Sequence, residues 1–303
     1  LTLLLLGGFR QLLAADPQLI VLGVAQDGGY PQAGCDRDCC RQAWQESGQR
    51  RFSSCLAIVD PDAKQRWILD CTPDFRDQLR LLDSKTAEWQ QEKLIDGIFL
   101  THAHVGHYAG LMHLGREVLG ADAIAVHAMP RMMYFLESNG PWSQLVDLRQ
   151  IELHRLAAGS TTWLNERISL TPFLVPHRDE FSETVGFRIE GPNRQAIYLP
   201  DIDKWQRWEV DINELVEEAD LAFLDGTFFD ASELPNRDMT EIPHPFVVES
   251  IRRFSTLAEI DRQKIHFLHL NHTNPLLRQD ASQCEVVLEA KLNVAQQGNR
   301  VEL

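Results

Sequence analysis

The stretch Leu94-Ile95-Asp96-Gly97-Ile98-Phe99-Leu100-Thr101-His102-Ala103-His104-Val105-Gly106-His107 joins an apolar run to three histidines. The apolar run is typical of a buried strand. If the chain leaves this strand extended, His102 and His104 project the same way, and a tight turn at Gly106 brings His107 towards them. Three converging imidazoles suit a divalent transition metal. The alternative is three unrelated histidines among the 11 of the chain, but three other strand ends favour the metal site.

The composition is typical of a globular protein and disfavours binding to nucleic acids or to membrane surfaces. The chain has 303 residues, of which 44% are hydrophobic and 24% charged, and such a chain forms one large domain or two small ones. No stretch approaches the roughly 20 apolar residues of a membrane span. The net charge of −15 disfavours attraction to nucleic-acid phosphates and anionic membranes. We therefore expect a small-molecule substrate and no nucleic acid, and the oligomeric state stays open.

The N-terminal residues 1–18 form an apolar segment with two interpretations. The leucine run 1–6 and the later Leu12-Leu13-Ala14-Ala15-Asp16 have the apolar core and small-residue exit of a secretory signal. However, no basic residue precedes the leucine run, and Arg10 interrupts the apolar stretch. We slightly favour export to the periplasm over a cytoplasmic protein with a packed N-terminal segment. Residues 19–303 contain no repeat or linker, which indicates a single domain.

The six cysteines divide into a cluster and three isolated residues. Cys35, Cys39 and Cys40 lie within six residues of one another, and this clustering favours zinc over a disulfide framework, provided that a fourth ligand exists elsewhere. The alternative for the cluster is reduced, buried cysteines. The isolated residues 55, 71 and 284 are interpreted as lone buried thiols.

Apolar periodicity predicts strands in succession and then strands alternating with helices. In the first half we expect strands at 19–24, 54–59, 67–70, 94–100 and 123–127, with helices at 73–82, 109–119 and 131–137. In the second half we expect strands at 171–175, 184–189, 196–199, 221–224 and 265–268, with helices at 212–218 and 246–254. Two β-rich halves with helices between and after them predict two sheets enclosed by helices.

Metal-binding residue types follow three further strands. The predicted strands 171–175, 196–199 and 265–268 are followed by His177, Asp201 and His269. Taken singly, each is most simply a loop residue, because Asp and His after a proline commonly occur at turns. Taken together with the first histidine cluster, they predict one metal site at the edge of the sheets.

The order of Asp70, the cluster His102, His104 and His107, then His177, Asp201 and His269 resembles the metallo-β-lactamase superfamily. The resemblance spans residues 70–269 and implies a four-layer αββα sandwich in the α/β class, with metals at the sheet edge. It implies one metal at His102, His104 and His177 and a second metal at His107 and His269. Asp201 would bridge the two metals and is interpreted as a catalytic residue. A hydroxide between the metals would attack the substrate. Asp70 would orient the histidine loop from behind the ligands.

Within the superfamily, three segments resemble the pyrroloquinoline quinone biosynthesis protein B family: Gly28 to Gln32, Ala219 to Thr227 and His269 to Leu276. That family keeps only one histidine of the second motif, whereas this chain has all three. The main hypothesis is a metal-dependent hydrolase of a phosphodiester or another small ester-like substrate, with Zn or Mn. The alternatives are an iron-dependent oxidase or hydroxylase related to pyrroloquinoline quinone biosynthesis and a non-catalytic metal-binding protein.

The chain also resembles the cyclic ribose phosphate phosphodiesterase of phosphonate breakdown. Both combine an N-terminal cysteine cluster with a histidine three residues after the last active-site histidine, here His272. The resemblance implies a structural zinc held by Cys35, Cys39, Cys40 and His272. The spacing C-x3-C-C differs from the C-x-C-x2-C of that family, so the choice of thiolates stays open.

Several positions near the site have two interpretations. Gly106 stands where the superfamily usually has an aspartate ligand, which predicts one tightly and one weakly bound metal unless a carboxylate such as Asp27 compensates. His244 is a proton donor or substrate contact, or else a solvated loop histidine. Asp225-Gly226-Thr227 forms the pocket floor or a plain turn. His113, His127, His154 and His266 are expected to be structural.

Overall fold

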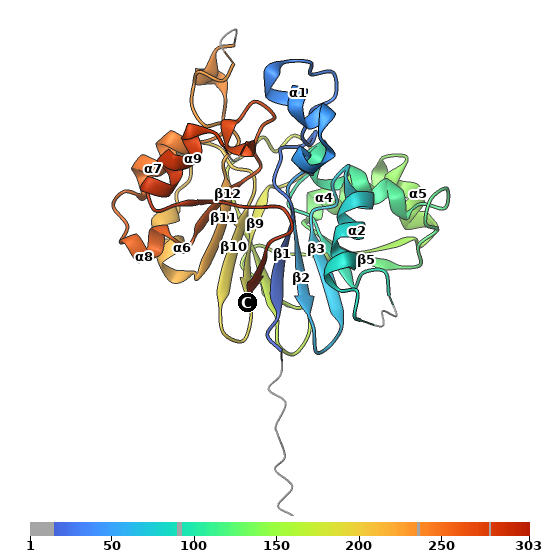
Figure 1. The fold of residues 1–303 in the computed structure, drawn as a ribbon. Helices are drawn as coiled ribbons and strands as arrows, with labels where there is room; N and C mark the ends of the chain where they lie inside the picture. The colour runs from blue at the N-terminus through green and yellow to red at the C-terminus, as the bar shows by residue number, and fades with distance from the viewer. Residues whose placement is uncertain (1–14, 90–92, 235–236, 279) are drawn as a thin grey trace, which may run out of the picture.

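The computed structural model describes residues 15–89, 93–234, 237–278 and 280–303. Most of the N-terminal segment 1–18, for which a secretory signal was one of two interpretations, therefore lies outside the described residues. Within the described part, the strands form two seven-stranded sheets with helices on the outer faces (Figure 1). The predicted αββα sandwich is confirmed.

The first sheet has the order β14-β1-β2-β3-β4-β5-β6 and the second β13-β12-β11-β10-β9-β8-β7. The strands of the first sheet are β1 Gln18–Gly23, β2 Cys55–Asp60, β3 Gln65–Leu69, β4 Gly97–Phe99, β5 Ile124–Ala128, β6 Ile151–Arg155 and β14 Arg300–Glu302. Those of the second are β7 Thr162–Trp163, β8 Ser169–Leu174, β9 Val185–Glu190, β10 Gln195–Leu199, β11 Leu221–Asp225, β12 Ile265–Leu268 and β13 Asn293–Val294.

The helices lie on opposite outer sides of the sandwich. Beside the first sheet are α2 Phe75–Lys85, α3 Val105–Tyr108, α4 Pro130–Ser138 and α5 Trp142–Asp147, and beside the second are α6 Ile212–Glu218, α7 Val247–Phe254, α8 Glu259–Arg262 and α9 Ser282–Glu289. Helix α1, Asp38–Gln45, lies at the top of the view in Figure 1. Among the described residues, we find no helix with both the length and the apolarity needed to cross a bilayer.

The central strands β1, β2 and β11 are buried along nearly their whole length, which explains why they are almost continuous apolar runs in the sequence. Along β1, Leu19 and Val21 pack into the core between the two sheets. The alternate residues Ile20 and Leu22 pack into a second core beneath the helices. This alternation follows from the two-residue repeat of a strand. The sandwich therefore has three apolar interfaces: one between the sheets and one under each layer of helices.

Two predictions about local structure were wrong. The expected helix 109–119 is a 3-10 helix, Ala109–Leu114, which follows the short α3 and is succeeded by turns at 115–119. The cause is tertiary, because the Gly110 N–H donates to the carbonyl of Cys71 at 2.8 Å instead of extending a regular helix. Cys284, expected to be buried, is partly exposed on α9, whereas Cys55 and Cys71 are fully buried.

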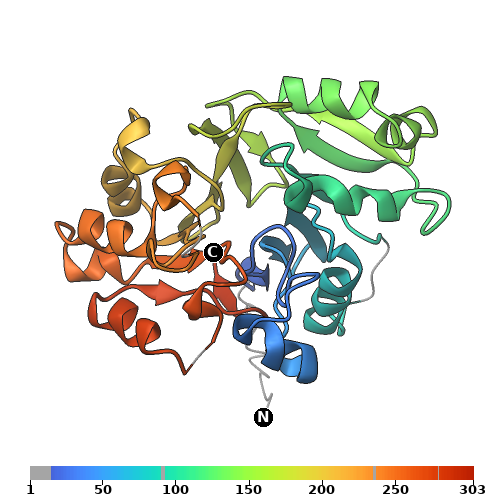
Figure 2. The ribbon, with the colours of Figure 1, turned by 90° about the horizontal axis from the view of Figure 1, so that it is seen from above.

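The topology brings the ends of many strands to one edge of the sandwich. In the first sheet, β3 and β4 are parallel, and β1 runs in the same direction because both it and β3 are antiparallel to β2. In the second sheet, β10, β11 and β12 are parallel, and β8 runs with them through antiparallel β9. The carboxyl ends of all these strands therefore meet at the edge seen from above in Figure 2.

Candidate metal centre

Three histidines from two segments, the loop after β4 and the loop after β8, present nitrogen atoms to one point at this edge. His104 Nδ1 lies 2.9 Å from His102 Nε2 and 3.2 Å from His177 Nε2. Ligands of a tetrahedral zinc with bonds of 2.0–2.1 Å are separated by about 3.3 Å. The three nitrogens that we predicted for the first metal thus lie together, at separations close to those of ligands around one transition metal.

The carboxylate of Asp201 lies in the middle of the histidines. Its Oδ2 is 3.3 Å from both His102 Nε2 and His177 Nε2, and 3.8 Å from His107 Nε2. It also lies 3.9 Å from His269 Nε2. Burial opposes ionisation of Asp201, but the surrounding histidines, His177 first, hold its pKa well below the usual range. This oxygen has the position that a ligand shared between two metals needs.

A second group of donors lies on the other side of Asp201. Asp27 Oδ1 is 3.5 Å from His107 Nε2 and 3.9 Å from His269 Nε2. All three atoms are buried and have no hydrogen-bond partner among the described residues. Buried polar atoms without partners are rare in proteins. This donor set suits a second divalent cation, and the two groups together support metal binding at this edge.

The ring nitrogens that face away from the centre are held by other side chains. The pairs are His102 Nδ1 with Thr101 Oγ1 at 2.9 Å, His107 Nδ1 with Asp70 Oδ2 at 2.7 Å, His177 Nδ1 with Asp203 Oδ1 at 3.2 Å, His269 Nδ1 with Thr227 Oγ1 at 2.9 Å, and His104 Nε2 with Glu180 Oε2 at 3.1 Å. A carboxylate beside one nitrogen keeps the proton there and leaves the other nitrogen free to bind metal. The structure thus places Asp70 where we predicted, behind the ligands.

Two of these residues have unusual backbone conformations. Asp70 has φ of 68° and His269 has φ of 60°, in the left-handed region that most residues avoid. Each is the residue that directly follows a strand, β3 and β12 respectively. The reversal turns the Asp70 and His269 side chains towards the centre, and such strain persists where the surrounding structure enforces it.

Comparison with known proteins places this arrangement in a family. The model of the β-lactamase superfamily domain matches residues 65–270, which contain nearly all of these ligands. The chain belongs to the β-lactamase superfamily.

Individual relatives agree with this assignment. Coenzyme PQQ synthesis protein B of Xanthomonas campestris pv. campestris is 27% identical over 312 residues, which cover 94% of this chain and all of that protein. The solved structure of Zn²⁺-bound PqqB from Methylobacterium extorquens superposes with a TM-score of 0.79 at 24% identity, covering 94% of this chain and 100% of the other. A diphosphatase from the PhnP family has a TM-score of 0.62 at 22% identity, covering 95% and 98%. Because the two solved structures are only 24% and 22% identical to this chain, their similarity shows a shared fold.

Beside the two donor groups lies His244, which is buried. Its Nδ1 is 2.8 Å from Asp225 Oδ2 and 3.1 Å from Asp201 Oδ1. Burial disfavours the charged ring, but the carboxylates of Asp225 and Asp201 outweigh it and raise the pKa of His244 well above its ordinary value. His244 is therefore not a solvated loop residue, which was one of its two interpretations.

The segment Asp225-Gly226-Thr227 is more than a plain turn. Asp225 Oδ1 accepts hydrogen bonds from the N–H and Oγ1 of Thr227, at 2.8 and 2.7 Å. Thr227 Oγ1 in turn contacts His269 Nδ1. Asp225 Oδ2 also contacts His244 Nδ1. This buried carboxylate therefore orients His244 directly and His269 through Thr227.

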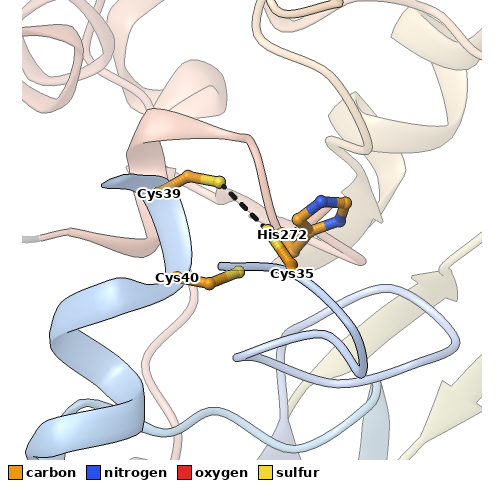
Figure 3. Close-up of side chains that lie close together, drawn as sticks. All are labelled: Cys35, Cys39, Cys40 and His272. Atoms are coloured by element: carbon orange, nitrogen blue, oxygen red, sulfur yellow. Dashed lines mark hydrogen bonds between the residues drawn. The ribbon is translucent and has the colours of Figure 1, made fainter. Parts of the chain in front are cut away.

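The cysteine cluster forms a separate donor group at the start of α1. The ligand atoms of Cys35, Cys39, Cys40 and His272 all lie within 4.8 Å of one another (Figure 3). The sulfurs of Cys35 and Cys39 are 3.7 Å apart, close to the spacing of about 3.8 Å expected for two thiolates with zinc bonds of 2.3 Å. His272 Nε2 accepts from Arg37 at 3.1 Å, while its buried Nδ1 has no partner among the described residues. These residues fit a structural zinc.

The electrostatics of the cluster agree with a bound cation. Burial opposes ionisation of Cys35, but hydrogen bonds from Arg37 and the other thiols lower its pKa. Burial and the neighbouring thiols raise the pKa of Cys40 to about 12. A zinc ion binds thiolates, so a bound zinc would favour the ionised form of these cysteines.

The remaining histidines lie elsewhere. His127 stacks between Phe99 and His154, with ring centroids 4.2 and 4.9 Å away. His113 and His266 stack on phenylalanine rings. Of the described residues that form donor groups, none is one of these four histidines, in line with the expectation that they are structural.

Sequence reasoning missed several residues that hold the ligands. Asp203 could have been found, because it lies two residues after Asp201 and so projects from the same strand end. Thr101 directly precedes the histidine motif. Glu180 lies in an irregular loop whose path no local pattern predicts, so only the structure could reveal its contact with His104.

Proposed function

We propose that the protein is a metal-dependent hydrolase that acts on a phosphodiester or another small ester-like substrate. The observation that carries the proposal is the pair of donor groups on either side of Asp201 Oδ2, one with three histidines and one with Asp27, His107 and His269. Such shared-carboxylate sites suit two-metal hydrolysis. Metals bound there would activate a water molecule and polarise the phosphoryl or carbonyl oxygen.

The side chains of the chain itself would position and enclose the reaction. Asp70, Asp203 and Thr227 hold three of the histidines in the orientation that metal binding needs. Four of the five histidine ligands have side chains that are at most 1% exposed, whereas that of His104 is 14% exposed. The substrate would thus approach past His104 and Glu180.

His244 is the candidate for the proton donor to the leaving group. Asp225 and Asp201 face its Nδ1 and favour the protonated ring, so its Nε2 is the nitrogen that remains for a substrate. The ring centroid of His244 is 5.5 Å from that of His177 and 6.1 Å from that of His269. It therefore lies beside both donor groups, within reach of a leaving oxygen.

The proposal is tested with bis(p-nitrophenyl) phosphate and purified protein loaded with zinc or manganese. We expect turnover in the unmodified protein and its loss in His104→Ala. His154→Ala is the matched control, because this imidazole stacks on His127 away from the donor groups and should leave activity unchanged. If metal-loaded protein cleaves no generic phosphodiester or ester, the hydrolase proposal is wrong.

A second candidate is an iron-dependent oxidation related to pyrroloquinoline quinone biosynthesis. It is favoured by the named relatives, which match 94% of the chain at 27% identity, and the same histidine and carboxylate ligands can hold iron. The metal content of protein purified without added metal separates the candidates: zinc or manganese supports hydrolysis, and redox-active iron supports oxidation. Metal binding without either reaction would support a non-catalytic role.

A further inference from the structure

We propose that Asp27, on the loop after β1, is the carboxylate ligand of the second metal and takes the place of the aspartate that the superfamily usually carries at the position of Gly106. The chain therefore keeps a complete second metal site with one ligand moved to a different segment. This inference rests on the metal centre of the proposed function but not on catalysis.

Asp27 and a side chain at position 106 would compete for the same space. A Cβ atom built on Gly106 would lie 2.0 Å from Asp27 Oδ1, 2.4 Å from its Cα and 2.7 Å from its Cγ. Packed heavy atoms do not approach this closely, because such contacts lie far inside the optimum of about 3.5–4.0 Å. Asp27 thus occupies the volume that a side chain at position 106 would need. The two positions exclude each other, and the glycine is what admits Asp27.

The second argument comes from the atoms that remain without partners. His107 and His269 each use Nδ1 to contact a protein acceptor, so their Nε2 atoms are free for a metal. These two atoms and Asp27 Oδ1 are buried without hydrogen-bond partners among the described residues. They converge within 4.8 Å of one another, and Asp201 Oδ2 lies 3.8–3.9 Å from both histidines. Two imidazoles and two carboxylates suit zinc, manganese or iron.

The third argument is that the Asp27 loop is held in register with the His269 loop. The N–H of Gln26 donates to the carbonyl of Leu270 at 2.8 Å, and Asn271 Nδ2 donates to Gln26 Oε1 at 2.5 Å. On the other side, Ser53 Oγ donates to the carbonyl of Asp27 at 2.9 Å. Rigid backbone of this kind positions a ligand before the metal arrives.

A consequence concerns the number of metals. The sequence alone predicts one tight and one weak metal, because the motif lacks its aspartate. That premise does not hold in three dimensions, since the second group has as many carboxylates as a site with aspartate at position 106 would have. We therefore expect two active-site metals to survive dialysis, in addition to zinc at the cysteine cluster.

The test exchanges the ligand between the two positions. Asp27→Ala, Gly106→Asp and the double variant Asp27→Gly/Gly106→Asp are dialysed against metal-free buffer, and metals per chain are measured by elemental analysis. Zinc affinity is measured by chelator competition. Asp77→Ala, which removes a carboxylate outside every donor group, is the control. All variants keep the cysteine cluster, so its zinc cancels in the comparison.

We expect Asp27→Ala to lose one metal per chain, with zinc affinity at the second site reduced more than the roughly 10- to 100-fold caused by losing an outer partner. Gly106→Asp alone should lower thermal stability through the clash with Asp27. The double variant should regain the metal and the stability.

The proposal is overturned if Asp27→Ala keeps both active-site metals at unchanged affinity. It is equally overturned if Gly106→Asp alone keeps full stability and metal content, or if the double variant folds, by circular dichroism, but does not regain the metal. None of these readouts requires turnover, so a failure of the hydrolase proposal would not be mistaken for a failure of this one.

Discussion

Replacing Asp70 by asparagine isolates the role of the carboxylate behind the histidine loop. Asp70 is fully buried, and its Oδ1 accepts hydrogen bonds from the N–H and Oγ1 of Thr101, both at 2.8 Å. Its Oδ2 accepts from His107 Nδ1 at 2.7 Å and from the hydroxyl of Tyr198 at 3.3 Å. Asparagine has the same shape and tolerates the left-handed φ of 68°. The backbone should therefore not change.

The expected effect of Asp70→Asn comes from hydrogen bonding alone. If the amide oxygen keeps the bonds to Thr101, its NH₂ group faces His107 Nδ1, which must then act as acceptor. The ring proton moves to Nε2, the nitrogen that would bind metal. Losing a charge-assisted bond costs about 1.5–3 kcal/mol of stability. Zinc affinity at the second site should fall about 10- to 100-fold, the usual effect of losing an outer partner of a ligand.

Two measurements check this expectation. Urea unfolding of the metal-free proteins gives the stability difference, and chelator competition gives the zinc affinity. Asp122→Asn, at an exposed position just before β5, is the control and should change neither. If Asp70→Asn binds two active-site metals with unchanged affinity and unfolds at the same urea concentration, then Asp70 does not orient His107 and the reasoning is refuted.

Two further predictions concern the cysteine cluster and the pH dependence of stability. Cys40→Ser should lower the zinc content by one ion per chain. It should also lower the free energy of unfolding by about 4 kcal/mol when free zinc is 1,000-fold above its dissociation constant. The control Cys284→Ser should change neither quantity, and equal zinc content in both variants would contradict the proposed zinc site. Burial and the neighbouring His154 lower the pKa of His127 to about 4, below the unfolded value of about 6.5. The unfolded chain therefore takes up this proton first, and stability falls by up to roughly 3 kcal/mol as the pH drops from 6.5 to 4. His127→Phe keeps the ring stack on Phe99 and should remove the loss of stability that protonation of His127 causes. Identical stability–pH curves for His127→Phe and the unmodified protein would contradict this prediction.

The sequence predicted the parts of the fold that depend on local pattern. The apolar runs of β1, β10, β11 and β12 were found because strands buried on both faces are nearly continuous apolar runs. The four edge strands, β6, β7, β13 and β14, were all missed, because edge strands need little apolar sequence. The region after His107 was assigned to a helix because its apolar spacing allows one, but hydrogen bonds to Cys71 determine its actual path.

The sequence also determined which residues form most of the centre. His102, His104, His177, Asp201 and His269 follow strands, and strands that run in the same direction end at the same edge. Their residue types and order were therefore enough to predict a metal site and its superfamily. The partners that orient them, such as Asp203 and Glu180, carry no motif, because a hydrogen bond across loops depends on where the loops meet.

What only the tertiary structure decided is the position of Asp27 beside Gly106, on which our proposal of a complete second metal site rests. From the sequence, Gly106 lacks the usual aspartate, and Asp27 is only one carboxylate that could compensate, because a motif records only residues that are adjacent in the chain. In the structure, the absence of a side chain at Gly106 admits Asp27 from a loop about 80 residues earlier. Metal coordination depends on the positions of donor atoms and not on their order, so a carboxylate can move to another segment without leaving the site.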